Sequence, residues 1–552
     1  MLAFQSGKAQ SIYELEIVGD PDGLLTNQLK EISFSDSTTL KSHIHEVIGA
    51  LQKQGYWLAN LDRLSFDGDR ALLKVFVGKK FNDLLVAGSN LDFASQRKLG
   101  LSDKKLPKSY STEESSQALD KIVAYYNNHG YPFASAKLDS FKMGKNRLHC
   151  EISVAPGRII LLDSLGLTSP PPATTRFLSQ YFGLELGSLY SQKTVDEIVA
   201  KSKRLAFLKL EEEPTVYFAL QKAKLQLSLA EVKANVFDGI IGLVPGTNGA
   251  KSDINGELNL ELKNLFRSGK SFDFHWKKIT TKTQQLNVSY YHPFIFSSPL
   301  SMSLAFDQLK ENTVFSNRKL TFGLELLAGA YSNIGFNFQN RQGNTLQDFD
   351  EASGDFDVNF YGLNFTYDKL DDPTFPKQGI YSTLNARVGL KNISSNSLTP
   401  SDVKKSNQYE FSGLFDLYHP MSKRSVLHAR LTSGIMENDK LFLNDLFRVG
   451  GLNSIRGFNE NHFFASKYAL ASIEWQIYLE ANSLIFLFYD QAVLERQVFS
   501  GSTSAKPSGL GAGVKMSVKN GMFNLIYGLG NPDTNGFSFD QSKVHFGYTG
   551  RF

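Results

Sequence analysis

The spacing of apolar residues divides the chain near residue 230. Before that point apolar residues recur at intervals of three and four, as on one face of a helix, for example at Leu40, Ile44 and Leu51. After that point apolar and polar residues alternate with a period of two, which is typical of β-strands, and the alternation continues to the end of the chain. We therefore predict an α+β amino-terminal part and an all-β carboxy-terminal part.

The amino-terminal part repeats one pattern three times. In the first copy a helix ending at Gly55 precedes strands over residues 61–66 and 71–77. About 75 residues later a helix ending at Gly130 precedes the next pair of strands, and a third, weaker copy has its helix around Val195. Repetition at a regular period indicates repeated domains, each a small sheet with helices on one face. We predict three such domains, at residues 11–80, 81–157 and 158–229.

Residues 230–552 are predicted to form an antiparallel barrel. The alternating segments number about 16, and the span of 323 residues leaves about 20 residues for each strand and its connection. The connections are unequal, since residues 267–269 form a tight turn whereas residues 341–355, 392–406 and 437–466 are long and polar. An even number of strands of roughly 10 tilted residues, with short turns at one end and long loops at the other, is typical of bacterial outer-membrane barrels.

The composition agrees with a membrane barrel but does not require one. The 552 residues include 43 Phe and 22 Tyr against only 3 Trp, and aromatic side chains suit the two membrane interfaces of a barrel. The mean hydropathy is −0.23, and no apolar run reaches the roughly 18 to 20 residues of a membrane helix. A large soluble β-protein with an aromatic core has a similar composition, so both classes stay open at this point.

Charge and candidate ligands exclude several functions. A net charge of +4 is too small to indicate nucleic-acid binding, and the single cysteine, Cys150, excludes an intramolecular disulfide. His43 and His45 lie two apart on a predicted helix and do not share a face, so a solvated or capping role is expected. Residues 533–540 lack the terminal acidic ligand of a calcium loop and are expected to join the last two strands. We expect no enzymatic activity, cofactor or metal, because no catalytic set has a supporting context.

The first and last residues of the chain carry candidate signals for export and for assembly into the outer membrane. Residues 1–10 lack the apolar core of a complete signal peptide and are interpreted either as the tail of a truncated one or as a disordered start. At the other end, apolar residues alternate up to the terminus, and a barrel must close its last strand onto its first because open edges in lipid leave backbone groups unpaired. Phe546, Tyr548 and Phe552 resemble the outer-membrane β-signal. In a soluble protein the same segment would be a final core strand.

One loop motif resembles a known family. Residues 448–458 (RVGGLNSIRGF) lie before the twelfth predicted strand, and no strand–glycine loop–helix context supports a nucleotide site there. The segment resembles the RGF signature on the sixth extracellular loop of the BamA/TamA superfamily. Residues 130–134 (GYPFA) and 154–159 (VAPGRI) resemble the polypeptide-transport-associated (POTRA) domain, and residues 368–381 resemble a strand–turn segment of the same family. The resemblance covers nearly the whole chain.

The resemblance implies POTRA repeats followed by a 16-stranded transmembrane barrel, with a loop that folds back into the lumen. Arg456 would then be held by a carboxylate and an aromatic ring, as a confined guanidinium requires. A solvated loop arginine is the alternative. The implied loop-lock residues are Ile455, Arg456, Gly457 and Phe458, and their implied lumen partners are Glu474, Phe488 and Asp490.

The implied function is assembly, insertion or translocation of polypeptides at the bacterial outer membrane, with the POTRA domains in the periplasm and a barrel that opens sideways. The implied partners are outer-membrane lipids, unfolded outer-membrane or secreted polypeptides, and periplasmic chaperones or lipoproteins, without nucleic acid. A two-partner secretion exporter is the first alternative, although that group usually has two POTRA domains and a plug helix. A scaffold barrel in a larger outer-membrane complex is the second, and a porin has no reason to carry three POTRA domains.

Overall fold

The computed structural model describes residues 14–550 except 21–22, 27–36, 68–69, 82, 100–107, 145–146, 168–169, 245–252, 281–282, 312, 347–352, 395–404, 500, 519–520, 533–535 and 540–541. The chain separates into two compact units. The first comprises Met1–Asp163, Leu186–Lys193 and Phe218–Ala223, and the second comprises Ser164–Glu185, Thr194–Tyr217 and Lys224–Phe552.

The first small sheet has the order β1-β3-β2, formed by β1 (Glu14–Val18), β2 (Asn60–Asp67) and β3 (Arg70–Phe76). Strand β1 runs parallel to β3, whereas β2 runs antiparallel to it. Helix α2 (Ser37–Lys53) buries its apolar stripe in one core with the sheet, which confirms the helical spacing seen in the sequence. The fully buried members of this core are Leu25, Leu40, Ile44, Leu51, Ala71 and Leu73.

The second small sheet has four strands in the order β5-β4-β7-β6. A capping box at Ser111 and Glu114 starts its main helix, α4, because each side chain bonds the backbone N–H of the other residue. Strands β4 and β5 were not predicted, because their sequences lack a clear alternating pattern. The elements are β4 (Asp83–Ser89), α3 (Phe93–Lys98), β5 (Lys108–Ser111), α4 (Thr112–Asn127), β6 (Ser135–Met143) and β7 (Leu148–Ala155).

A third small sheet has the order β10-β11-β8, and a two-stranded ladder joins β9 to β12. Three small mixed sheets with helices therefore precede the barrel, as the α+β repeat pattern predicts. The elements are β8 (Leu161–Leu167), α5 (Thr175–Phe182), α6 (Gln192–Lys203), β9 (Leu208–Leu210), β10 (Thr215–Ala219), β11 (Lys222–Leu227) and β12 (Leu229–Glu231).

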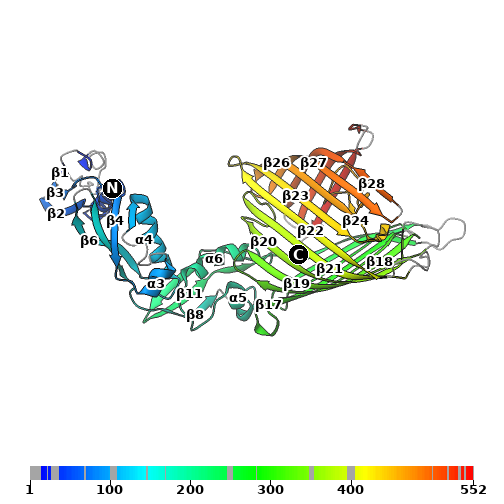
Figure 1. Cartoon of the computed structure of the whole chain (residues 1–552), viewed down its shortest axis with the longest axis horizontal. Helices are drawn as coiled ribbons and strands as arrows, with labels where there is room; N and C mark the ends of the chain where they lie inside the picture. Colours follow the sequence, from blue (N-terminus) through cyan, green and yellow to red (C-terminus); the bar gives the residue numbers. More distant parts are fainter. Residues whose placement is uncertain are drawn as a thin grey trace, which may run out of the picture. The chain divides into compact units, whose positions relative to one another are not determined.

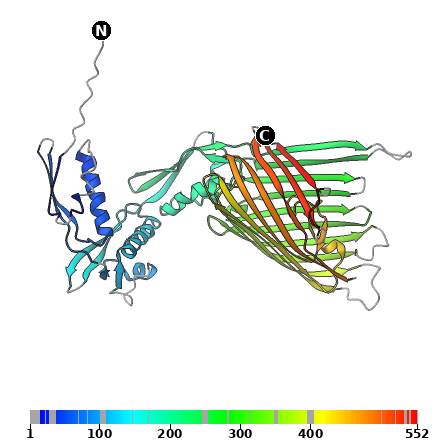
Figure 2. The same ribbon diagram turned by 90° about the horizontal axis from the view of Figure 1, so that it is seen from above.

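All remaining strands except β24 and β25 form one antiparallel barrel with 16 strand positions, or staves, around its wall (Figures 1 and 2). The sheet contains 17 strands, but β28 and β29 pair with successive parts of β27 and so make up one interrupted stave. This confirms the predicted count. The strands are β13 (Val236–Val244), β14 (Asp253–Leu265), β15 (Lys270–Thr280), β16 (Thr283–His292), β17 (Leu300–Glu311), β18 (Phe315–Leu327), β19 (Ser332–Thr345), β20 (Phe356–Leu370), β21 (Gly379–Ile393), β22 (Lys405–Pro420), β23 (Ser425–Glu437), β26 (Lys467–Glu480), β27 (Ser483–Val498), β28 (Gly501–Ala505), β29 (Ser508–Val518), β30 (Gly521–Asn531) and β31 (Lys543–Gly550).

The two faces of the barrel have opposite chemistry. Along β27, Ile485 and Leu487 are exposed on the outer face, whereas Phe488 and Asp490 are buried on the inner face. An exposed apolar outer face is costly in water and stable in lipid, which identifies the barrel as membrane-spanning. Outward apolar residues recur around the wall at Leu304, Leu320, Phe336, Leu363, Leu390, Phe411, Leu431, Ile473, Leu525 and Phe546.

Strand lengths differ from the expectation of about 10 residues, since β22 and β27 each contain 16. Residues 341–345 were predicted to be loop but belong to β19, which continues to Thr345. The prediction was wrong because this segment is polar, and polar residues such as Arg341 line the inner face of the strand and are paired there.

The two ends of the barrel sheet, β13 and β31, lie next to each other (Figure 2). Within the described residues no hydrogen-bonded ladder joins them.

Among the helices that the structure describes, none has the length and apolar character needed to cross a membrane.

Candidate functional site

Residues 438–466, between β23 and β26, form the loop that carries the RGF motif, and they fold into the barrel. We call this segment the lumenal loop. It contains a short 3-10 turn, Leu443–Asp445, and a small ladder between β24 (Phe447–Val449) and β25 (Phe463–Ala465). Its apolar residues share cores with inward-facing residues of β23, β26 and β27. Its buried members are Leu441, Phe442, Leu446, Val449, Ile455, Phe458 and Ala465.

Arg456 is bound on three sides inside the barrel. Its backbone N–H and its Nε donate to Asp490 Oδ2 at 3.0 and 2.9 Å, and its Nη2 donates to Asp490 Oδ1 at 2.6 Å. Its Nη1 pairs with Glu474 Oε1, and its Nη2 also donates to Ser472 Oγ at 2.8 Å. The guanidinium carbon lies 3.7 Å from the ring centroid of Phe488. The structure thus brings Arg456 together with Glu474, Phe488 and Asp490, in a bidentate and stacked arrangement that arginine fits better than lysine.

The backbone around Gly457 lies directly on two barrel strands. Gly457 has a φ of +91°, and a Cβ there would lie 2.6 Å from the backbone nitrogen of Gly530. Glycines of β29 and β30 permit the approach from the other side, since a Cβ on Gly509 would lie 2.1 Å from the carbonyl oxygen of Arg456. Phe458 packs edge-on against Phe463 at a centroid distance of 5.0 Å. The motif therefore depends on glycines in the barrel wall that carry no motif of their own in the sequence.

Glu474 links Arg456 to a second buried group of charges. His428 lies between two carboxylates, with Nδ1 3.0 Å from Glu474 Oε2 and Nε2 2.8 Å from Asp416 Oδ1. Arg430 donates to both oxygens of Asp416 at 2.7 and 3.0 Å. These charges lie on β22, β23 and β26, and each is balanced by a neighbour, as buried charges require. Asp416, His428 and Arg430 were not predicted as site residues, although the period-two pattern puts them on the inner face.

A turn between β20 and β21 packs against the apolar side chains that surround the Arg456 guanidinium. This turn, residues 371–378, belongs to the segment that resembles the family's strand–turn motif. Phe375 packs in one core with Phe486 and Phe488, the latter stacked on Arg456. Lys515 Nζ donates to the carbonyl of Thr374 at 2.7 Å, and the Tyr478 hydroxyl donates to the carbonyl of Pro376 at 2.7 Å. The turn is therefore fixed to β26 and β29, far along the sheet from its own strands.

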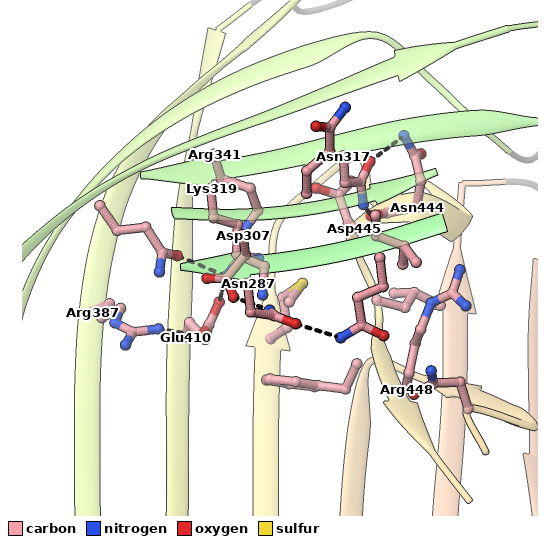
Figure 3. A pocket seen from close by; sticks show the side chains of 18 residues that line it. Asn287, Asp307, Asn317, Lys319, Arg341, Arg387, Glu410, Asn444, Asp445 and Arg448 are labelled. Carbon is pink, nitrogen blue, oxygen red and sulfur yellow. Dashed lines mark hydrogen bonds and ion pairs between the residues drawn. The ribbon is translucent and has the colours of Figure 1, made fainter. Parts of the chain in front are cut away.

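A polar cavity of about 310 Å³ lies between the lumenal loop and β16 to β22 (Figure 3). Glu410 lies at its edge and pairs with Arg341 at 2.7 Å and with Arg387 at 2.9 Å. Asn444 and Arg448 of the loop form the opposite side (Figure 3). Arg341, Arg387 and Glu410 all belong to the wall, whereas Asp445 and Arg448 of the loop pair with Lys391 and Glu311 of the wall.

Two of the three residues that resemble a β-signal lie on the last described strand. Phe546 and Tyr548 are on β31 with exposed fractions of 68% and 48%, on the outer face. The Phe546 ring contacts the Phe523 ring on β30 at a centroid distance of 5.2 Å. Phe552 lies outside the described residues.

The weaker sequence candidates have ordinary surroundings. His43 pairs with Glu46 at 3.2 Å, and His45 Nδ1 lies 2.6 Å from the carbonyl of Lys41 one helical turn earlier. Cys150 is buried in the second small sheet, and burial raises the pKa of its thiol to about 11. In the part of the chain that the structure describes, no group of His, Cys, Asp and Glu side chains is arranged to hold a metal ion.

The fold is similar to that of solved outer-membrane proteins. The chain is similar in structure to CdiB from Escherichia coli, at 14% identity and a TM-score of 0.56, covering 93% of this chain and 97% of that one. It is also similar to CdiB from Acinetobacter baumannii, at 11% identity and a TM-score of 0.53, covering 86% of this chain and 91% of that one. BamA from Haemophilus ducreyi lacking POTRA domains 1-3 matches at 13% identity and a TM-score of 0.44, covering 86% of this chain and 100% of that one. No curated protein sequence matches the chain.

A family model agrees over the region that contains the site. The model of the Omp85 superfamily domain matches residues 264–552, just over half of the chain, including the lumenal loop, Arg456 and its partners. Members of this family are non-enzymatic insertion or translocation factors of the outer membrane. The matched region, the 16-stave barrel and the preceding small sheets together give the assignment: the chain belongs to the Omp85 superfamily, as a BamA/TamA-type outer-membrane barrel.

Proposed function

We propose that this protein inserts or translocates polypeptides at the outer membrane, with its small amino-terminal domains in the periplasm. The observation that carries the proposal is the seam between β13 and β31, where the described residues form no ladder. Unpaired strand edges bind extended polypeptides through backbone hydrogen bonds. A seam that opens sideways would therefore offer a client strand both an edge to pair with and a path into lipid.

The lumenal loop supports this role as a fixed internal element. Arg456 and its carboxylate partners join the loop to β27 and β26, which are three and four strand positions from β31 in the barrel. A loop held in this way keeps one wall of the barrel rigid while the seam moves. The clients are unfolded outer-membrane or secreted polypeptides, and chaperones or lipoproteins would meet the protein at the small domains.

A reversible disulfide across the seam tests the proposal. A Cβ on Gly550 would lie 3.4 Å from the carbonyl oxygen of Phe237, so Phe237→Cys with Gly550→Cys, in a Cys150→Ala background, places two thiols at the seam. We expect oxidation to stop client insertion into proteoliposomes and reduction to restore it. The control pair, Leu260→Cys with Phe274→Cys, joins two strands that are already paired.

The same experiment separates the alternatives. Full insertion by the oxidised seam variant would contradict sideways opening. Continued transport of a client across the membrane by that variant would favour an exporter that uses the lumen, and the absence of either activity in the unmodified protein would favour a scaffold.

A further inference from the structure

The lumenal loop contacts a second wall of the barrel, far from Arg456. Its first limb, residues 440–448, contacts β17 to β21, whereas the RGF motif contacts β26, β27, β29 and β30. Strands β22 and β23 separate the two walls on one side. The polar contacts of the two ends therefore lie on different strands, whereas apolar residues of the first limb also pack against Met436 of β23 and Val498 of β27.

A buried ion pair forms the centre of the second attachment. Lys391 Nζ on β21 lies 2.5 Å from Asp445 Oδ2 on the loop, and both side chains have an exposed fraction of 0%. The same ammonium donates to the carbonyl of Lys440 at 2.8 Å. It lies 4.8 Å from the ring centroids of Phe356 on the wall and Phe442 on the loop, and these two rings are parallel within 8°. Most of the groups that enclose the ammonium therefore belong to the loop, namely Lys440, Phe442 and Asp445.

Two further contacts flank this pair. The Asn444 side chain accepts from the backbone N–H of Gly354 at 3.1 Å and donates to the carbonyl of the same residue at 3.0 Å. Asn317 on β18 donates to the carbonyl of Asn444 at 2.6 Å, and these side chains face each other across the cavity edge in Figure 3. Arg448 pairs with Glu311 on β17 at 3.0 Å. Strands β17, β18 and β21 and the connection before β20 therefore hold the first limb.

We propose that Lys391 and Asp445 form a second latch of the lumenal loop, independent of the RGF motif. Each latch holds its own limb, so the loop spans the lumen as a strut and can be released at one end while the other stays bound. The physical reason is the burial of Lys391, because an ammonium enclosed by apolar rings is stable only while Asp445 neutralises it. Lys391 and Asp445 are positioning residues that act through the loop.

Two reporter cysteines in a Cys150→Ala background test the proposal on the intact protein alone, without a client. Leu446→Cys reports on the first limb and Ile455→Cys on the RGF end, and both positions are buried. The measurement is the rate of labelling by a membrane-impermeant maleimide. With Lys391→Met we expect labelling of Leu446→Cys to accelerate on the order of 100-fold, as the loss of a buried pair predicts, and labelling of Ile455→Cys to change less than about threefold.

Two matched variants complete the test. Lys263→Met removes a lumen lysine that pairs with Asp273 on the neighbouring strand, and it should accelerate neither reporter. Lys391→Met with Asp445→Asn removes both charges and keeps an acceptor for the Phe442 N–H, so we expect it to reverse most of the acceleration.

Unchanged labelling of Leu446→Cys in Lys391→Met would overturn the second latch. Equal acceleration of both reporters would also overturn it, since the loop would then be released as one piece. If Lys391→Met does not fold, Asp445→Asn breaks the pair from the other side and keeps an acceptor for the Phe442 N–H, and unchanged labelling of Leu446→Cys there would likewise overturn the proposal. Because no client is involved, failure here leaves the proposed transport function untouched.

Discussion

Removing the Arg456 side chain is the perturbation whose cost the structure defines best. The guanidinium makes bonds to Asp490, Glu474 and Ser472, and its side chain has an exposed fraction of 8%. Arg456→Ala would leave Asp490, with an exposed side-chain fraction of 0%, without its counter-charge. Breaking a buried pair from one side costs about 3–5 kcal/mol, which sets the expected loss in the free energy of unfolding.

The remaining partners of Glu474 and Asp490 determine how the loss of stability is divided between these two carboxylates. Glu474 keeps His428 and Gln476 as partners, whereas Asp490 keeps only Ser472 and the backbone N–H of residue 456. Most of the penalty should therefore fall on Asp490. Arg456→Gln with Asp490→Asn removes both charges, and we expect it to recover at least half of the lost stability, because no buried charge is left unpaired.

The assay is heat-modifiability on gels, in which a folded barrel and its unfolded chain migrate differently. We expect the temperature of half-conversion to fall for Arg456→Ala and to recover in the double variant. Arg496→Ala is the control, since Arg496 lies on the same strand as Asp490 with an exposed side chain. An unchanged half-conversion temperature for Arg456→Ala would refute the loop-lock reasoning.

Three further predictions test separate features. Gly509→Ala should lower the half-conversion temperature in the gel assay about as much as Arg456→Ala, because its Cβ would lie 2.1 Å from the carbonyl oxygen of Arg456. Gly547→Ala is the control, since a Cβ at that position on β31 would lie in open space. Deletion of Phe552 should reduce the fraction of the protein that reaches the outer membrane, measured by fractionation, and normal assembly would contradict the β-signal interpretation. The free energy of unfolding of the amino-terminal part should fall as pH rises from 9 towards 11, because the Cys150 thiol ionises at its ordinary pKa of 9.0 when unfolded and at about 11 when folded. Denaturant titrations of Cys150→Ala should lack that part of the pH dependence.

The sequence alone determined the change from an α+β part to an all-β barrel and the number of barrel strands. Period-two alternation fixes which residues of a strand share a face, so the two-residue spacing of Phe488 and Asp490 is enough to place them on the same side of the wall. The change from helical spacing to alternation marked the start of the barrel, and the number of alternating segments gave its 16 staves. These features are local, because spacing along a strand or helix depends only on backbone geometry.

The tertiary structure decided which inner-face residues meet. Asp416, His428 and Glu474 come together through the register of β22, β23 and β26, and no local pattern encodes that register. The pairing of Lys391 with Asp445 required the path of a loop through the lumen, which depends on wall glycines and on aromatic packing distant in the chain. Alternation assigns a face to each residue, but strand register and the course of the loop assign its partners.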